Sequence, residues 1–271
     1  MNVFTNAKSH ARERPVQGLS PSVPCPSVLI TGGSSGVGAA VAARFAAEGA
    51  WDVLLSGRDR GRLGRVADAC GAVALPEDLR DRTSHQRLVS TALTHVRHLD
   101  VLVASAGVGW AGPFDHMPAD KIDEILAVDL AAVVHLTRLV LPHMLRRDRG
   151  HLAFIGSIAG SVGVRDEAVY AASKAALETF ATSLRYELRG TRVGISMIIP
   201  GAVDTPFFTR RGRPYHRSRP HPVSPVRVAE AVHDAVVHRR AEVYLPAWLR
   251  LPARFQGVAP GLFHRLATRL G

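Results

Sequence analysis

The chain contains 271 residues, of which 46% are hydrophobic and 21% charged, and its formal net charge is +11. This balance is typical of a globular domain with a substantial core, and it excludes a fibrous or wholly disordered chain. The positive charge is spread over every segment without a nucleic-acid-binding motif, so we expect no nucleic-acid partner.

The start of the chain is polar and rich in Ser, Pro and Arg, so residues 1–26 are predicted to form a disordered leader. It contains no secretory-signal pattern, and Cys25 and Cys70 have no motif spacing, which favours a reduced, cytoplasmic setting. The histidines lack metal-ligand spacing, so no metal site is expected.

From residue 27 onwards, short apolar runs alternate with helical stretches. Strands are predicted at residues 27–31, 51–56, 72–75, 100–105, 151–157, 192–199 and 242–245. Helices are predicted at residues 36–49, 59–70, 82–99, 119–145, 166–188 and 226–238. Because the strands are continuously apolar, both faces of the sheet should be buried. We therefore predict an α/β fold, a doubly wound (Rossmann-type) parallel sheet in a single domain over residues 27–245, with ligands at the carboxyl ends of the strands.

A glycine-rich loop, Thr-Gly-Gly-Ser-Ser-Gly-Val-Gly from Thr31 to Gly38, follows the first predicted strand and leads into an Ala-rich helix. Glycines let a backbone turn sharply near a pyrophosphate, and the helix N-terminus offers free N–H groups to the anion. The candidate cofactor contacts in this loop are Gly32, Ser34, Ser35, Gly36, Val37 and Gly38. The alternative is a flexible Gly/Ser loop without a ligand.

Three further motifs follow in order, each near a predicted strand end. Tyr170 and Lys174 are four residues apart on one predicted helix, so their side chains can share a site. Ser157 lies 13 residues before Tyr170, and Pro200-Gly201 follows the next strand. With the glycine-rich loop, this set resembles the short single-domain branch of the short-chain dehydrogenase/reductase superfamily over roughly residues 27–245.

The resemblance implies hydride transfer between a nicotinamide cofactor and a ketone or secondary alcohol. Tyr170 would give or take the proton, and Ser157 would hold the reacting oxygen. A free tyrosine titrates near pH 10. The ammonium of Lys174 would favour the phenolate, and the same lysine would bind the nicotinamide ribose.

Cofactor preference is indicated at the end of the second strand, where the chain reads Ser56-Gly57-Arg58-Asp59. NAD sites usually place an acid there, whereas a basic residue meets the 2′-phosphate of NADP. Arg58 therefore favours NADP(H) over NAD(H), unless it is only a surface arginine. The resemblance adds further cofactor contacts at Asp78, Leu79, Ala106, Gly107, Tyr170, Lys174, Pro200, Gly201, Val203 and Thr205.

Two positions depart from the family pattern. Ala104-Ser105-Ala106-Gly107 stands where the family has Asn-Asn-Ala-Gly, and Asp129 stands where a helix Asn completes the catalytic tetrad. An ionised Asp accepts hydrogen bonds but does not donate them. We expect Asp129 to act with Lys174 and activity to be retained. The alternatives are a partly exposed helix charge and a protein that binds NADP without catalysis, such as a sensor.

The segment after Asp204 and the end of the chain are expected to surround the substrate. Residues 204–225 are predicted to be a lid whose arginines, at 210, 211, 213, 217 and 219, either attract an acidic substrate or form a solvated loop. Residues 246–271 are predicted to be a tail that packs on the domain or in an oligomer, and the resemblance implies a homodimer or homotetramer. The expected partner is a small carbonyl or alcohol. The apolar stretch at 125–145 carries Asp129, His135 and Arg138, so we expect no membrane span and no membrane association.

Overall fold

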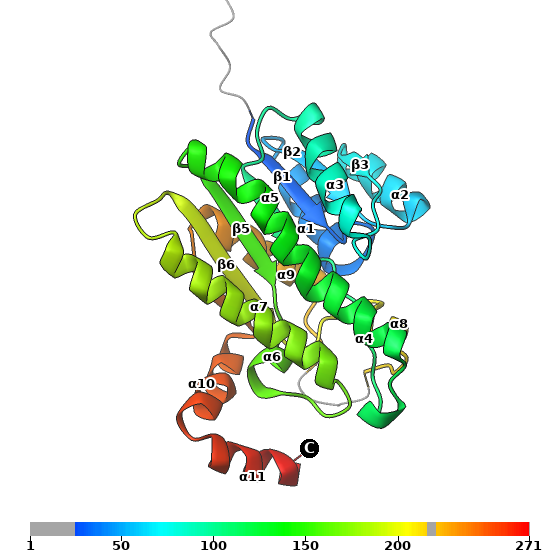
Figure 1. Ribbon diagram of the computed structural model, residues 1–271, viewed down its shortest axis with the longest axis vertical. Helices are drawn as coiled ribbons and strands as arrows, with labels where there is room; N and C mark the ends of the chain where they lie inside the picture. Colours follow the sequence, from blue (N-terminus) through cyan, green and yellow to red (C-terminus); the bar gives the residue numbers. More distant parts are fainter. Residues whose placement is uncertain (1–24, 216–220, 271) are drawn as a thin grey trace, which may run out of the picture.

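The computed structural model describes residues 25–215 and 221–270 of the protein. Residues 1–24 of the predicted leader and residues 216–220 of the predicted lid lie outside the described residues, as does residue 271. Within the described part, the chain forms one α/β domain with helices on both faces of a parallel sheet (Figure 1).

The sheet has seven strands in the order β3-β2-β1-β4-β5-β6-β7, and every neighbouring pair is parallel. Its strands are β1 Ser27–Thr31, β2 Asp52–Ser56, β3 Val73–Leu75, β4 Val101–Ala104, β5 Gly150–Ile155, β6 Val193–Pro200 and β7 Glu242–Leu245. The chain order reverses between β1 and β4, so a crevice opens beside their carboxyl ends. This arrangement confirms the predicted doubly wound sheet.

The main helices lie in two layers. One layer contains α3 Arg82–His95, α4 Ala119–Leu126, α5 Ala132–Arg146 and α7 Ala168–Glu187, and the other contains α1 Gly36–Ala46, α2 Arg60–Cys70 and α9 Pro225–Val237. Short helices lie at the crevice end and in the tail: η1 Phe114–His116, α6 Ile158–Val162, α8 Phe207–Arg210, η3 Ala247–Leu249, α10 Arg250–Val258 and α11 Pro260–Leu270.

Alternate side chains of each strand enter opposite cores. In β1, Leu29 belongs to the core under α3, α5 and α7, whereas Val28 and Ile30 belong to the core under α1 and α9. Each such side chain is fully buried, which stabilises the fold by about 1.5–3 kcal/mol per residue. Burial on both faces therefore explains why the strands are continuously apolar.

The predicted helix at 119–145 is present but is not uniform. The stretch Ala119–Arg146 is long and apolar enough to cross a membrane by composition alone, yet Leu136, Val140 and Met144 are buried against the sheet. It is therefore a core helix of the domain. A π-helical turn, η2 Ala127–Ala131, separates α4 from α5 and carries Asp129. Such turns are rare and frequently occur at functional sites.

Within the described residues, the six short helices at the crevice end and in the tail were not predicted. The strand expected to reach residue 157 ends at Ile155, because Ser157 is the N-cap of α6 and its Oγ accepts the Ala159 N–H at 3.2 Å. In the tail, α10 packs against α6, and α10 and α11 extend beyond the body of the domain (Figure 1).

Candidate active site

A cleft of about 1200 Å³ lies beyond the carboxyl ends of the central strands. Within the described part of the chain, the predicted catalytic and cofactor-binding residues line it, from the glycine-rich loop to Thr205, except for Asp129, which lies behind Lys174. The fold thus brings together motifs that are spread over most of the chain.

The glycine-rich loop can approach a ligand closely only because its glycines lack a Cβ. Gly32 has φ +69°, and a Cβ there would lie 2.7 Å from the Cα of Ala106. A Cβ on Gly38 would overlap the carbonyl oxygen of Gly32. The loop leads directly into the N-terminus of α1, where free N–H groups favour an anion. The loop therefore fits the pyrophosphate of a dinucleotide.

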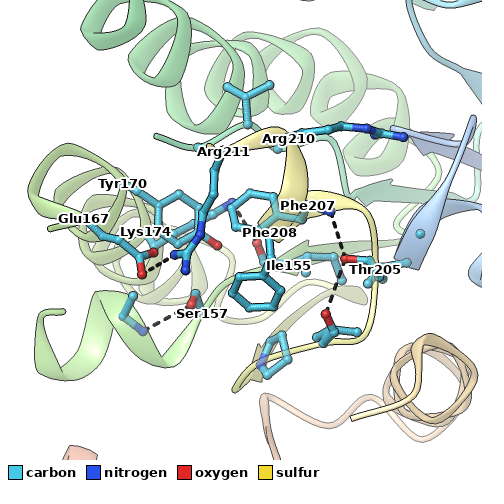
Figure 2. Close-up of a pocket in the computed structure, with 18 of the residues that line it drawn as sticks. Ile155, Ser157, Glu167, Tyr170, Lys174, Thr205, Phe207, Phe208, Arg210 and Arg211 are labelled. Atoms are coloured by element: carbon cyan, nitrogen blue, oxygen red, sulfur yellow. Dashed lines mark hydrogen bonds and ion pairs between the residues drawn. The ribbon is translucent and has the colours of Figure 1, made fainter. Parts of the chain in front are cut away.

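Ser157, Tyr170 and Lys174 meet at one end of the cleft (Figure 2). Ser157 begins α6, while Tyr170 and Lys174 lie one turn apart on α7. Ser157 lies close enough to Tyr170 to lower the pKa of its phenol, and the Nζ of Lys174 lies 5.6 Å from the centre of the Tyr170 ring. The same Nζ donates to the carbonyl oxygen of Ile155 at 3.2 Å.

Asp129 forms a buried ion pair with Lys174. Its Oδ2 lies 3.1 Å from Nζ, and the two side chains are 0% and 5% exposed. Its Oδ1 accepts the Val108 N–H at 2.8 Å. Gly107 leaves room for the pair, because a Cβ there would lie 3.3 Å from Oδ2. Asp129 is therefore not the exposed helix charge that was the alternative interpretation of the sequence.

These charges set the protonation of the site. Burial raises the pKa of Asp129, and although burial lowers the pKa of Lys174, the Asp129 carboxylate reverses that effect and raises it overall. Burial also raises the pKa of Tyr170, which Lys174 opposes and Asp129 reinforces. Tyr170 is thus a protonated phenol at neutral pH and is suited to donate a proton.

The other end of the cleft carries the residues predicted to bind the adenosine. Arg58 follows β2, and its Nη1 donates to Oε1 of Glu124 on α4 at 2.9 Å. Asp78 accepts hydrogen bonds from Arg80 and lines the cleft beside Leu79. Arg58 is 52% exposed at the side chain, so a phosphate can reach it.

The lid and tail add contacts that the sequence analysis did not predict. The ring of Phe207, on α8, lies 5.3 Å from that of Tyr170, and Arg211 forms an ion pair with Glu167 (Figure 2). From the tail, Trp248 and Phe263 line the cleft. Two adjacent phenylalanines inside the Arg-rich lid are the sequence feature that could have indicated Phe207. No feature of the sequence indicated Glu167 or Trp248.

The fold and the cleft are those of an NAD(P)-dependent oxidoreductase. The family model described as short chain dehydrogenase matches residues 26–215. A ketoacyl reductase, HetN, of a Nostoc species is 36% identical over 225 residues, which cover 80% of this chain and 77% of that protein. The chain therefore belongs to the short-chain dehydrogenase/reductase family.

Solved structures of the family superpose closely on this one. A short-chain dehydrogenase/reductase from Burkholderia phymatum in complex with NAD matches with a TM-score of 0.79 and 26% identity, covering 88% of this chain and 95% of that one. A short-chain dehydrogenase from Sphingobium yanoikuyae in complex with NADPH matches with a TM-score of 0.75 and 27% identity, covering 87% and 96%. Structural relatives thus bind either dinucleotide.

Proposed function

We propose that the protein is an NADP(H)-dependent oxidoreductase that interconverts a ketone and a secondary alcohol, acting on CH–OH groups. The observation that carries this proposal is the convergence of Ser157, Tyr170 and Lys174 at one end of a cleft whose other wall is the glycine-rich loop. When bound, the nicotinamide supplies or accepts the hydride.

In carbonyl reduction, Tyr170 donates its phenolic proton to the substrate oxygen, and Ser157 holds that oxygen by a hydrogen bond. The raised pKa of Tyr170 keeps the proton in place until then. In alcohol oxidation, the phenolate must accept the proton, and the Lys174 ammonium stabilises it.

Lys174 is held for this role from two sides. The carbonyl oxygen of Ile155 and the carboxylate of Asp129 position its Nζ beneath Tyr170. We propose that Asp129 takes the place of the family's helix Asn, keeping Lys174 protonated and passing protons toward solvent.

The preference for NADP(H) rests on Arg58, with Asp78 and Leu79 at the adenine. The ratio of kcat/KM for NADPH and NADH tests it, and a preference for NADH would contradict it. Substitution of Arg58 by Met should lower this ratio by at least about 10-fold, since a charge-assisted hydrogen bond to phosphate is lost.

The substrate end of the cleft favours a carbonyl compound with apolar substituents. Phe207, Phe208 and Trp248 line the cleft there, and Arg211 is neutralised by Glu167. Aromatic walls bind apolar surface, while the few polar groups orient the reacting oxygen.

The decisive experiment is Tyr170→Phe, with NADPH oxidation followed over a panel of ketones. The kcat should fall by about 10²–10⁴-fold, which is the contribution typical of a general acid. The affinity for NADPH should stay within about 2-fold of that of the parent protein. Tyr186→Phe, at a tyrosine that is 67% exposed, is the matched control and should behave as the parent protein. A fully active Tyr170→Phe variant would sink the assignment, and a parent protein that binds NADPH without turnover would support a sensor instead.

We also propose a cytoplasmic homodimer or homotetramer that uses the faces of α4, α5 and α7. Leu126 on α4 and Leu145 on α5 are exposed, and both Cys25 and Cys70 are free thiols. Light scattering of the purified protein tests the assembly, and a monomer at micromolar concentration would contradict it.

A further inference from the structure

Three arginines line the cleft near the glycine-rich loop: Arg58 after β2, Arg62 on α2, and Arg210 at the end of the lid helix α8. Two of them have a carboxylate partner, because Arg58 pairs with Glu124 at 2.9 Å and Arg62 with Asp59 at 2.7 Å. Among the described residues, the hydrogen-bond partner of Arg210 is a neutral group, the Oγ of Ser35, to which its Nη1 donates at 3.1 Å.

The positive charges at this place act on one another. Partial burial, followed by the charges of Arg62 and Arg58, lowers the pKa of Arg210. Asp59 opposes this effect only in part, and the hydroxyl of Ser35 brings no charge, so the guanidinium of Arg210 is left to attract an anion beside Arg58 and Arg62. A phosphate dianion would give Arg210 the charged partner that Arg58 and Arg62 already have.

The other described arginines of the lid point elsewhere. Arg211 pairs with Glu167, and Arg213 pairs with Asp166 at 2.7 Å. In Figure 2, Arg210 points away from Tyr170, whereas Arg211 points toward Glu167. Arg211 and Arg213 thus dock the lid, and their charges are matched. Arg210 is left to face the cofactor end of the cleft.

We infer that Arg210 binds the 2′-phosphate of NADP(H) together with Arg58 and Arg62, and that this contact couples the identity of the cofactor to the docking of the lid over Tyr170. This inference rests on the proposed NADP(H) function and deepens it. The lid helix α8 contacts both the substrate end and the cofactor end of the cleft. Phe207 contacts Tyr170, and Arg210, three residues later, donates to Ser35.

The coupling has a direct structural consequence. The 2′-phosphate of bound NADP(H) would pair with Arg210. This contact would hold α8 in the position that places Phe207 over the substrate end. NAD(H) has a hydroxyl at the same place, leaves the corner without an anion and holds the lid less firmly.

The first test uses ligands without a nicotinamide, adenosine 2′,5′-bisphosphate and adenosine 5′-monophosphate, with binding measured by calorimetry. The parent protein should prefer the bisphosphate. Arg210→Met should reduce that preference by at least about 10-fold while the affinity for the monophosphate stays within 2-fold. Arg192→Met, at an arginine that pairs with Asp148 and whose side chain is 80% exposed, is the matched control and should leave the preference unchanged.

The second test measures hydrogen exchange of the lid backbone, residues 204–215, at saturating NADP⁺ or NAD⁺. NADP⁺ should slow the exchange more than NAD⁺ in the parent protein, and Arg210→Met should remove this difference. Neither measurement depends on turnover.

The outcomes separate the two proposals. A parent protein that binds both adenosine ligands equally would overturn the NADP(H) preference and the inference together. A parent protein that prefers the bisphosphate, with Arg210→Met unchanged in both tests, would overturn the role of Arg210 alone.

Discussion

The carboxylate of Asp129 lies 3.1 Å from the ammonium of Lys174, and both side chains are buried behind the ring of Tyr170. An acid in this position does two opposing things. It keeps Lys174 protonated and in place, but it also raises the pKa of Tyr170, for which burial is the larger cause. Burial, reinforced by Asp129 and opposed by Lys174, therefore favours the protonated phenol, which is the form required for carbonyl reduction.

Replacing Asp129 by Asn should move the pH profile of alcohol oxidation to lower pH. The substitution removes a negative charge that raises the pKa of Tyr170, so the phenolate forms at lower pH. The measurement is kcat/KM for the alcohol against pH. Asp123→Asn, at an exposed acid of α4, should leave the profile unchanged. A profile that stays in place or moves to higher pH would show that Asp129 does not act on Tyr170.

Ser157→Ala should lower kcat by about 10²–10³, because the hydroxyl that holds the substrate oxygen is lost. Ser157→Thr keeps a hydroxyl and should retain more activity. Both variants are compared by single-turnover kinetics with NADPH. Because Ser157 also caps α6, the Ala variant should lose about 1 kcal/mol of unfolding free energy, which thermal unfolding measures separately. An Ala variant with the parent's kcat would contradict the catalytic role.

Phe207→Ala should raise KM for an apolar ketone by about 10-fold, with a smaller effect on kcat, because apolar surface is removed beside Tyr170 rather than a reacting group. Steady-state kinetics at saturating NADPH measures both constants. Phe114→Ala, at a phenylalanine that is 61% exposed, is the control and should leave KM unchanged. Equal losses for both variants would argue against a substrate contact at Phe207.

Glu178, on α7, provides a test of stability against pH. Burial raises its pKa from 4.5 to about 7, and a hydrogen bond from Ser161 only partly opposes this. The unfolded chain releases this proton near pH 4.5 and the folded chain near 7, so folding becomes less favourable as pH rises between these values. Glu178→Gln should therefore raise Tm at pH 8 and have little effect at pH 4.

Thermal unfolding of the Glu178→Gln variant and the parent at both pH values provides the measurement. Glu230→Gln, at an exposed glutamate of α9, is the control. A stabilisation of equal size at pH 4 and pH 8 would mean that the ionisation of Glu178 is not the cause.

Most of the fold and the set of candidate site residues were predictable from local sequence. Strand and helix alternation, apolar runs, the glycine-rich loop and the spacing of Ser157, Tyr170 and Lys174 are short-range features, so they predicted the parallel sheet and the cleft at its carboxyl edge. The helix of Asp129 was also predictable, but its π-helical turn was not, because hydrogen-bond register within a helix leaves no clear mark in composition.

By itself, the sequence determined the kind of chemistry: which residues stand at the strand ends and which groups they carry. Only the tertiary structure decided how the charges pair. Asp129 and Lys174 are distant in sequence, yet they are buried together as an ion pair. Of two neighbouring arginines, Arg211 pairs with Glu167, whereas Arg210 donates a hydrogen bond to Ser35. A charge acts through its burial and its nearest partner, and both are set by segments that meet only when the chain has folded.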